Sequence, residues 1–92
     1  MSLSNEQKQD LRHAILEGLV NRHPAALSPR QIQRAVKKEV DFLFEESDVL
    51  ASLELLKGMA PALVNSTEDP LGGGHYWAAT SAGVLHVERN HA

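Results

Sequence analysis

The sequence predicts a mainly α-helical domain with one small β-hairpin, an α+β fold in the order helix, helix, helix, strand, turn, strand, helix. Three observations support this order. Ser-x-x-Gln capping boxes begin at Ser4 and at Ser28, and each precedes a helical repeat of apolar residues. A third amphipathic stretch follows Ser47. Residues 62–89 then have the pattern of strand, glycine turn, strand and helix.

The first helix is expected to begin after Ser4, whose hydroxyl can cap it while the Gln7 side chain returns to the backbone of the cap. It ends at His23-Pro24, because a residue before proline avoids the helical region. Leu16 and Val20 lie outside its apolar stripe and therefore need cover from another element. The stripe itself repeats at spacings of three and four: Leu11, Ala14, Ile15, Gly18 and Leu19.

The second helix has the clearest start signal, with Ser28 as the cap, Pro29 at the first helical position and Gln31 completing the box. It is expected to end near Glu39. Residues 40–44 should then form an extended connector or short strand against the edge of the core. Apolar residues occupy one face of this helix, and cations crowd the other: Arg30, Arg34, Lys37 and Lys38.

The third helix is expected to open at Ser47, within a run of acids that suits the positive end of the helix dipole. Its inward stripe consists of Val49, Leu53 and Leu56, and Leu50 can join it. Gly58 is expected in the left-handed conformation that ends many helices.

The hairpin is expected to pair residues 62–67 with residues 75–79. The turn falls in Pro70–Gly74, because three glycines reach the positive φ values that a tight reversal needs. Thr80 or Ser81 can then cap a final helix from about Ser81 onward.

Length and composition limit the classes of protein that fit. With 92 residues, the chain is expected to form one domain, residues 1–92, with a single modest core. It contains no cysteine, which excludes disulfides and thiolate zinc sites and suits a reducing compartment. No apolar run approaches the length of a membrane span. We therefore expect a soluble, cytoplasmic protein without membrane contact.

Three segments carry a resemblance to a known family: Ser28–Val36, Val49–Met59 and the stretch Tyr76-Trp77-Ala78-Ala79-Thr80-Ser81-Ala82-Gly83. Together they resemble the winged helix-turn-helix domain of bacterial and phage transcription regulators. In that family a Tyr-x-Leu-Thr-x-x-Gly stretch commonly closes the second strand of the hairpin, or wing, and here Ala79 stands in place of the leucine. The resemblance implies a DNA-binding or transcription-associated protein whose third helix enters the major groove.

The distribution of charged residues disfavours DNA binding. The formal net charge is −3, and the expected outward face of the third helix contains two carboxylates and one cation: Asp48, Ala51, Ser52, Glu54, Leu55 and Lys57. The turn from Glu68 to Gly74 adds acids and no cation. Any contact with double-stranded DNA is therefore expected to be weak and nonspecific, through the cations Arg30, Arg34, Lys37, Lys38 and Lys57. The competing interpretation of the second helix is an ordinary solvated face.

The alternative function is a protein-interaction module that keeps the winged fold without binding DNA. Leu55, on the outer side of the third helix, suits close approach of another protein. A homodimer is expected to use the first and final helices, through Leu16, Val20, Val84, Leu85 and Val87. Equally, the final helix can pack on the first within one chain and complete its core.

Catalysis has little support, so we expect no enzyme, no catalytic residue, no cofactor and no metal. No two histidines have the i, i+4 spacing of a helical zinc site, although His86 and His91 are five apart. The run Gly72-Gly73-Gly74 lacks the Lys-Ser/Thr that follows a phosphate-binding loop.

Overall fold

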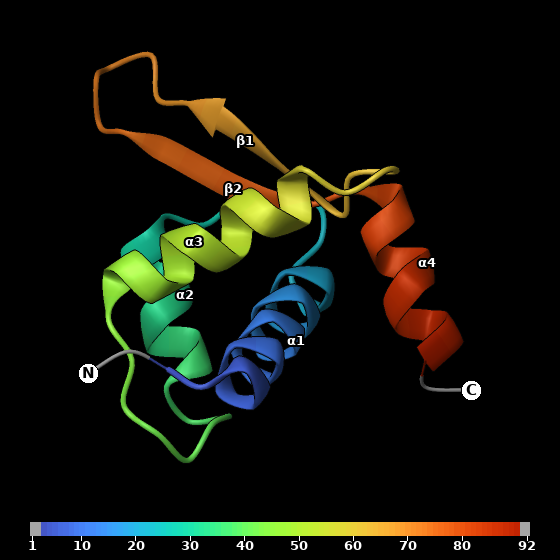
Figure 1. The fold of residues 1–92 in the computed structure, drawn as a ribbon. Coiled ribbons are helices and arrows are strands. Elements are labelled where there is room, and N and C mark those ends of the chain that lie inside the picture. Colours follow the sequence, from blue (N-terminus) through green and yellow to red (C-terminus); the bar gives the residue numbers. More distant parts are fainter. Residues whose placement is uncertain (1–2, 91–92) are drawn as a thin grey trace.

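The computed structural model describes residues 3–90, which form an α+β domain of four helices and one antiparallel two-stranded hairpin (Figure 1). The predicted order of elements is confirmed: α1 (Asn5–Asn21), α2 (Pro29–Val36), α3 (Glu46–Lys57), β1 (Val64–Glu68), β2 (His75–Ala79) and α4 (Ser81–Asn90). No helix in this part of the chain is long and apolar enough to cross a bilayer.

The two predicted capping boxes begin α1 and α2. The Ser4 hydroxyl accepts the Gln7 N–H at 3.1 Å, and the Gln7 side chain accepts the Ser4 N–H at 3.0 Å. Ser28 and Gln31 make the same exchange at 3.2 and 2.9 Å. Because each box satisfies two backbone donors that a helix end otherwise leaves without partners, the sequence determines both starting points.

Helix α3 begins one residue earlier than predicted. Its N-cap is Glu45, and the Asp48 carboxylate accepts the Glu45 N–H at 2.8 Å, so Ser47 lies in the first turn instead of opening the helix. Gly58 ends the helix in the right-handed region, with φ −79°, so the prediction of a left-handed residue there is wrong. The connector before α3 contains no strand, although Phe42 and Phe44 pack against the core edge as expected.

The hairpin pairs Val64 with Ala79 at its base and Glu68 with His75 toward its tip. Strand β2 has the predicted bounds, and β1 begins two residues later than predicted. On its other side, β2 makes a short bridge that the sequence pattern did not reveal. Leu27 and Trp77 exchange two backbone hydrogen bonds of 2.8 Å, which anchors the start of α2 to the hairpin.

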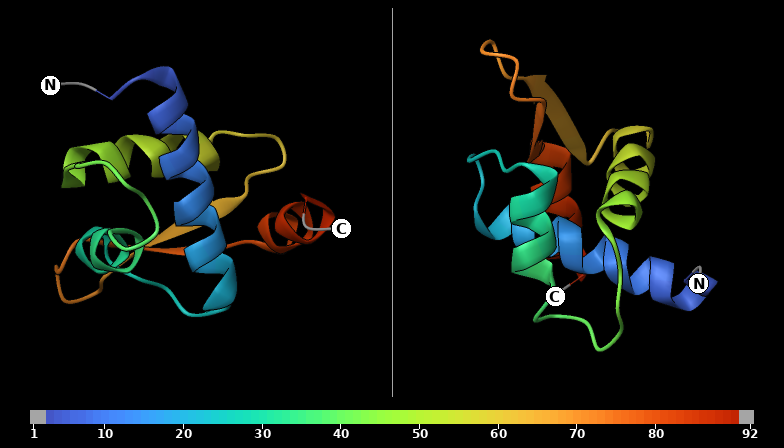
Figure 2. Two further views of the ribbon diagram at one scale, coloured as in Figure 1. Left: turned by 90° about the horizontal axis from the view of Figure 1, so that it is seen from below. Right: turned by 90° about the vertical axis from the view of Figure 1, so that its left-hand side faces the viewer.

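The core lies around α1, which has α2 and α3 on one side and α4 on the other (Figure 2). Every helix except α4 contributes fully buried aliphatic side chains, and β1 adds Val64. The largest fully buried residues are Leu11, Ile15, Leu19, Ile32, Val36, Val49, Leu53 and Val64.

Helix α4 packs on α1 within the same chain, which corrects part of the predicted dimer interface. Leu16 is only 3% exposed, so it offers no surface to a second copy while α4 is in place. Val20 and Val87 are half-buried and pack against the same core. Leu16 is therefore covered within one chain, and the missing side chain of Gly83 lets α4 approach Leu16 and the backbone of Leu63 closely.

Candidate functional site

The outward face of α3 is the first candidate surface. The helix packs on α1 and α2 through Val49, Leu53 and Leu56, which leaves its other side in solvent. Two leucines are exposed there, Leu50 at 39% and Leu55 at 49%. The surrounding exposed residues are acidic or small, namely Glu45, Glu46, Ser47, Ala51 and Glu54.

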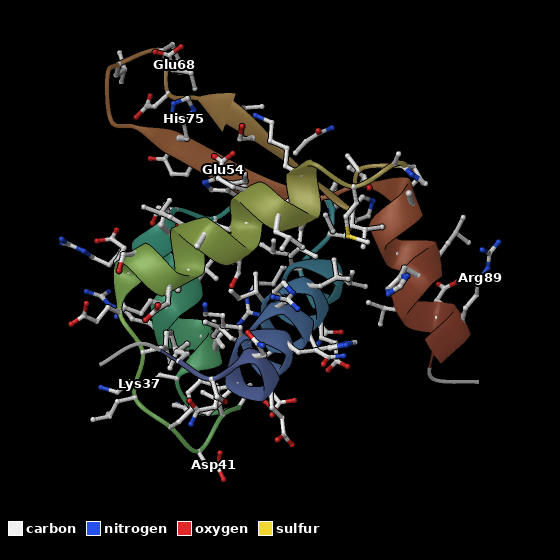
Figure 3. All side chains as sticks on the ribbon, viewed as in Figure 1. Lys37, Asp41, Glu54, Glu68, His75 and Arg89 are labelled. Atoms are coloured by element: carbon white, nitrogen blue, oxygen red, sulfur yellow. The ribbon has the colours of Figure 1, made fainter. Side chains whose placement is uncertain are left out.

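Two residues expected on this face lie elsewhere. Ser52 is buried, and its hydroxyl donates to the Asp48 carbonyl oxygen at 3.0 Å. Asp48 is half-buried, and its carboxylate caps the helix. The Ser52 side chain is therefore covered, and one oxygen of the Asp48 carboxylate is already used by the helix end. The face is consequently more apolar than the sequence pattern implied, while Glu54 keeps it acidic beside the hairpin (Figure 3).

Lys57 is the cation at the end of α3, and its side chain contacts two residues of the hairpin. Its ammonium group donates to the Ser66 hydroxyl at 3.1 Å and lies 5.8 Å from the centroid of the Trp77 ring. A cation above an indole face is attracted by the ring quadrupole. The Trp77 Nε1–H is buried and has no hydrogen-bond partner among the described residues. Lys57 therefore joins α3 to the hairpin, about 16.5 Å along the helix from its acidic start.

The other predicted cations, Arg30, Arg34, Lys37 and Lys38, are all exposed on α2 or in the turn that follows it. They do not form one patch with Lys57, because Lys37 lies beside the connector at the start of α3 and Lys57 lies at the far end of that helix (Figure 3). Arg34 and Lys37 instead border a small cavity of about 190 Å³ against the connector. Its remaining lining comes from Gln33, Phe42, Leu43 and Phe44.

Lys38 faces a different depression, a broad groove of about 1060 Å³ between α1 and the end of α2. Both carboxylates and cations line it, including Asp10, Glu17 and Arg22. His13 also lines it. Among residues 3–90 no three histidine, aspartate or glutamate side chains are grouped so that they could hold a metal ion, and His91 lies outside the described residues.

Of the predicted partner-interface residues, Leu55 and Leu85 remain exposed, each at 49%. Val84 is half-buried on α4. The two leucines belong to separate elements, α3 and α4, which lie on different sides of α1 (Figure 1). They therefore mark two surfaces and not a single interface.

The cavity beside α2 is a feature that the sequence pattern did not reveal. The one signal for it was the alternation Phe42-Leu43-Phe44, in which the middle residue points away from its neighbours. The aromatic rings of Phe42 and Phe44 meet edge to face with centroids 6.4 Å apart, and Leu43 remains in solvent.

Comparisons with family models, with curated proteins and with solved structures each found no match to this chain.

Proposed function

We propose that the chain is a winged helix-turn-helix domain that acts as a protein-interaction module, with the outward face of α3 as its contact surface. The order of three helices, a hairpin and a final helix supports the fold assignment. The hairpin follows α3 directly and projects from the helices (Figure 1), as the wing does in that family.

The observation that carries the proposal is the chemistry of α3, the helix that would enter the DNA major groove in such a domain. Its outward face bears Glu46 and Glu54, and its terminal Lys57 is held by the hairpin. DNA carries one negative charge per roughly 1.7 Å of its axis, so an acidic face is repelled by it. Exposed Leu55, one helical turn from Ala51 on the same side of the helix, instead suits the desolvated centre of a protein interface.

Matched substitutions of two leucines test this proposal. Leu55 on α3 and Leu85 on α4 are equally exposed, at 49% each, so we expect glutamate to disturb the fold to a similar extent at either position. The wild-type protein and both variants are immobilised, and the proteins retained from a lysate of the source cells are quantified. We expect a partner that the wild type and Leu85→Glu retain and that Leu55→Glu loses. Equal retention by all three would contradict the proposal.

A second candidate function, weak binding of double-stranded DNA, is supported by the exposure of the cations on α2. Phosphate contacts by a few cations release few counterions, so log affinity should fall with log salt at a slope of roughly −0.9 per contacted phosphate. Fluorescence anisotropy with a labelled duplex at low salt measures this. Reversing charge at Arg34 and Lys37 should remove the binding, and Leu55→Glu should leave it intact. If the duplex still binds after the charge reversal, Arg34 and Lys37 do not mediate DNA binding.

A further inference from the structure

The cavity between α2 and the connector has the size and lining of a site for one apolar side chain. Its volume of about 190 Å³ is below the roughly 300–1,000 Å³ of small-molecule sites. Phe42 and Phe44 supply aromatic surface, and Leu43 stands beside them 90% exposed. A residue that docked here would bury this leucine as well as itself.

The border of the cavity is cationic, which specifies the charge of its occupant. Arg34 and Lys37 both line the cavity, and both side chains are exposed. The complementary segment is an apolar side chain with carboxylates next to it.

The tip of the chain's own hairpin has this composition. Leu71 is 92% exposed and follows Glu68, Asp69 and Pro70. Hydrogen bonds within the turn order the tip, because the Asp69 carboxylate accepts the Leu71 N–H at 2.9 Å and the Asp69 carbonyl accepts the Gly72 N–H at 3.0 Å. Leu71 is therefore held in solvent by a preorganised turn, which lowers the entropy lost when it docks.

The tip cannot fill the cavity of its own chain. Glu68 at the tip and Lys37 beside the cavity lie well apart, with α3 between them (Figure 3), and the right-hand view of Figure 2 shows the hairpin pointing away from the connector. The hairpin tip and helix α2, which contributes Arg34 to the cavity lining, nevertheless lie on the same side of the ribbon (Figure 1).

We propose that the cavity binds the hairpin tip of a second copy of this chain, with Leu71 in the cavity and the acidic side chains Glu68 and Asp69 beside Arg34 and Lys37. Two antiparallel copies exchange tips and form a closed two-fold dimer. The residues of this contact belong to the hairpin, to α2 and to the segments that flank α2 and α3, and none of them lies in α3, the helix of the proposed interaction surface. This dimer also differs from a dimer in which α1 and α4 form the interface.

Two variants test the contact, one altered at the hairpin tip and the other at the border of the cavity. The tip variant is Leu71→Ser, and the cavity variant combines Arg34→Glu with Lys37→Glu. All three side chains are exposed, so both proteins should fold, and their thermal midpoints verify this. Sedimentation from about 10 µM to 1 mM covers the affinity expected of a small interface. The wild type should dimerise, and either variant should raise the dissociation constant at least about tenfold.

Matched controls separate this contact from other routes to self-association. Arg30→Glu reverses a charge on α2 outside the cavity, and Leu85→Ser removes an exposed leucine from α4. Both should dimerise as the wild type does. Loss of the dimer in Leu85→Ser alone would overturn the proposal in favour of pairing through α4.

Mixing the two variants provides the decisive measurement. The cavity variant keeps an intact tip and the tip variant keeps an intact cavity, so one heterodimer contact is restored. An equimolar mixture should contain heterodimer, weaker than the wild-type dimer, while each variant alone stays monomeric. A wild type that is monomeric at about 1 mM, or a mixture as monomeric as its components, would overturn the proposal.

Discussion

Substituting Gly83 with alanine tests the account of how α4 is held on the domain. A Cβ at this position would collide with the carbonyl oxygen of Leu63 and stand 3.3 Å from Cδ1 of Leu16. The Leu63 oxygen cannot withdraw freely, because it accepts the Thr80 N–H at 3.0 Å. Relief therefore requires α4 to move away from Leu63.

Two effects of opposite sign set the size of the change. Alanine is favoured over glycine in a helix interior by up to about 1 kcal/mol. Overpacking a close contact costs about 1–3 kcal/mol, and the contact here is with backbone instead of a flexible side chain. Steric strain should win, so we expect Gly83→Ala to lower the free energy of unfolding by about 1–2 kcal/mol. For a domain of this size, that corresponds to a fall in Tm of roughly 5–15 °C.

Gly18→Ala is the matched control, because Gly18 lies inside α1 and its added Cβ would meet only the Arg22 side chain, at 3.8 Å. Here the preference of alanine over glycine in a helix acts without steric strain, so the free energy of unfolding should rise by up to about 1 kcal/mol. Urea and thermal unfolding followed by circular dichroism measure both variants. If Gly83→Ala were as stable as the wild type, the close approach of α4 to Leu63 and Leu16 would be refuted.

Two further predictions concern helix caps. Ser28→Ala should lower the free energy of unfolding by about 0.5–2 kcal/mol, because it removes the cap of α2, whereas Ser47→Ala should change it little, because that hydroxyl caps nothing. Equal effects in chemical denaturation would show the assignment of caps to be mistaken. Thr80→Val should destabilise by about 1–3 kcal/mol, since its hydroxyl donates to the Ala62 carbonyl at 2.7 Å and accepts the Gly83 N–H at 3.1 Å. A thermal midpoint unchanged in Thr80→Val would argue against this bridge.

The exposed cations of α2 were predictable, but the cavity that they border was not. A stripe of Arg and Lys opposite Ile32 and Val36 defines an outward helix face by spacing alone. The cavity exists because the connector returns against that face, and no local pattern states where a connector without regular structure will pack. The isolation of Lys57 is likewise a tertiary result, since its partners Ser66 and Trp77 come from the hairpin.

By itself, the sequence determined the elements: where α1 and α2 begin, the bounds of β2, the glycine turn and the final helix. These features depend on hydrogen bonds and φ preferences within a few residues of one another, so local patterns specify them. Only the tertiary structure decided that α4 covers Leu16, that Leu27 bridges to Trp77, and which side chains remain exposed. These outcomes depend on contacts between residues far apart in the chain, whose free energy is set by the packing of the whole core.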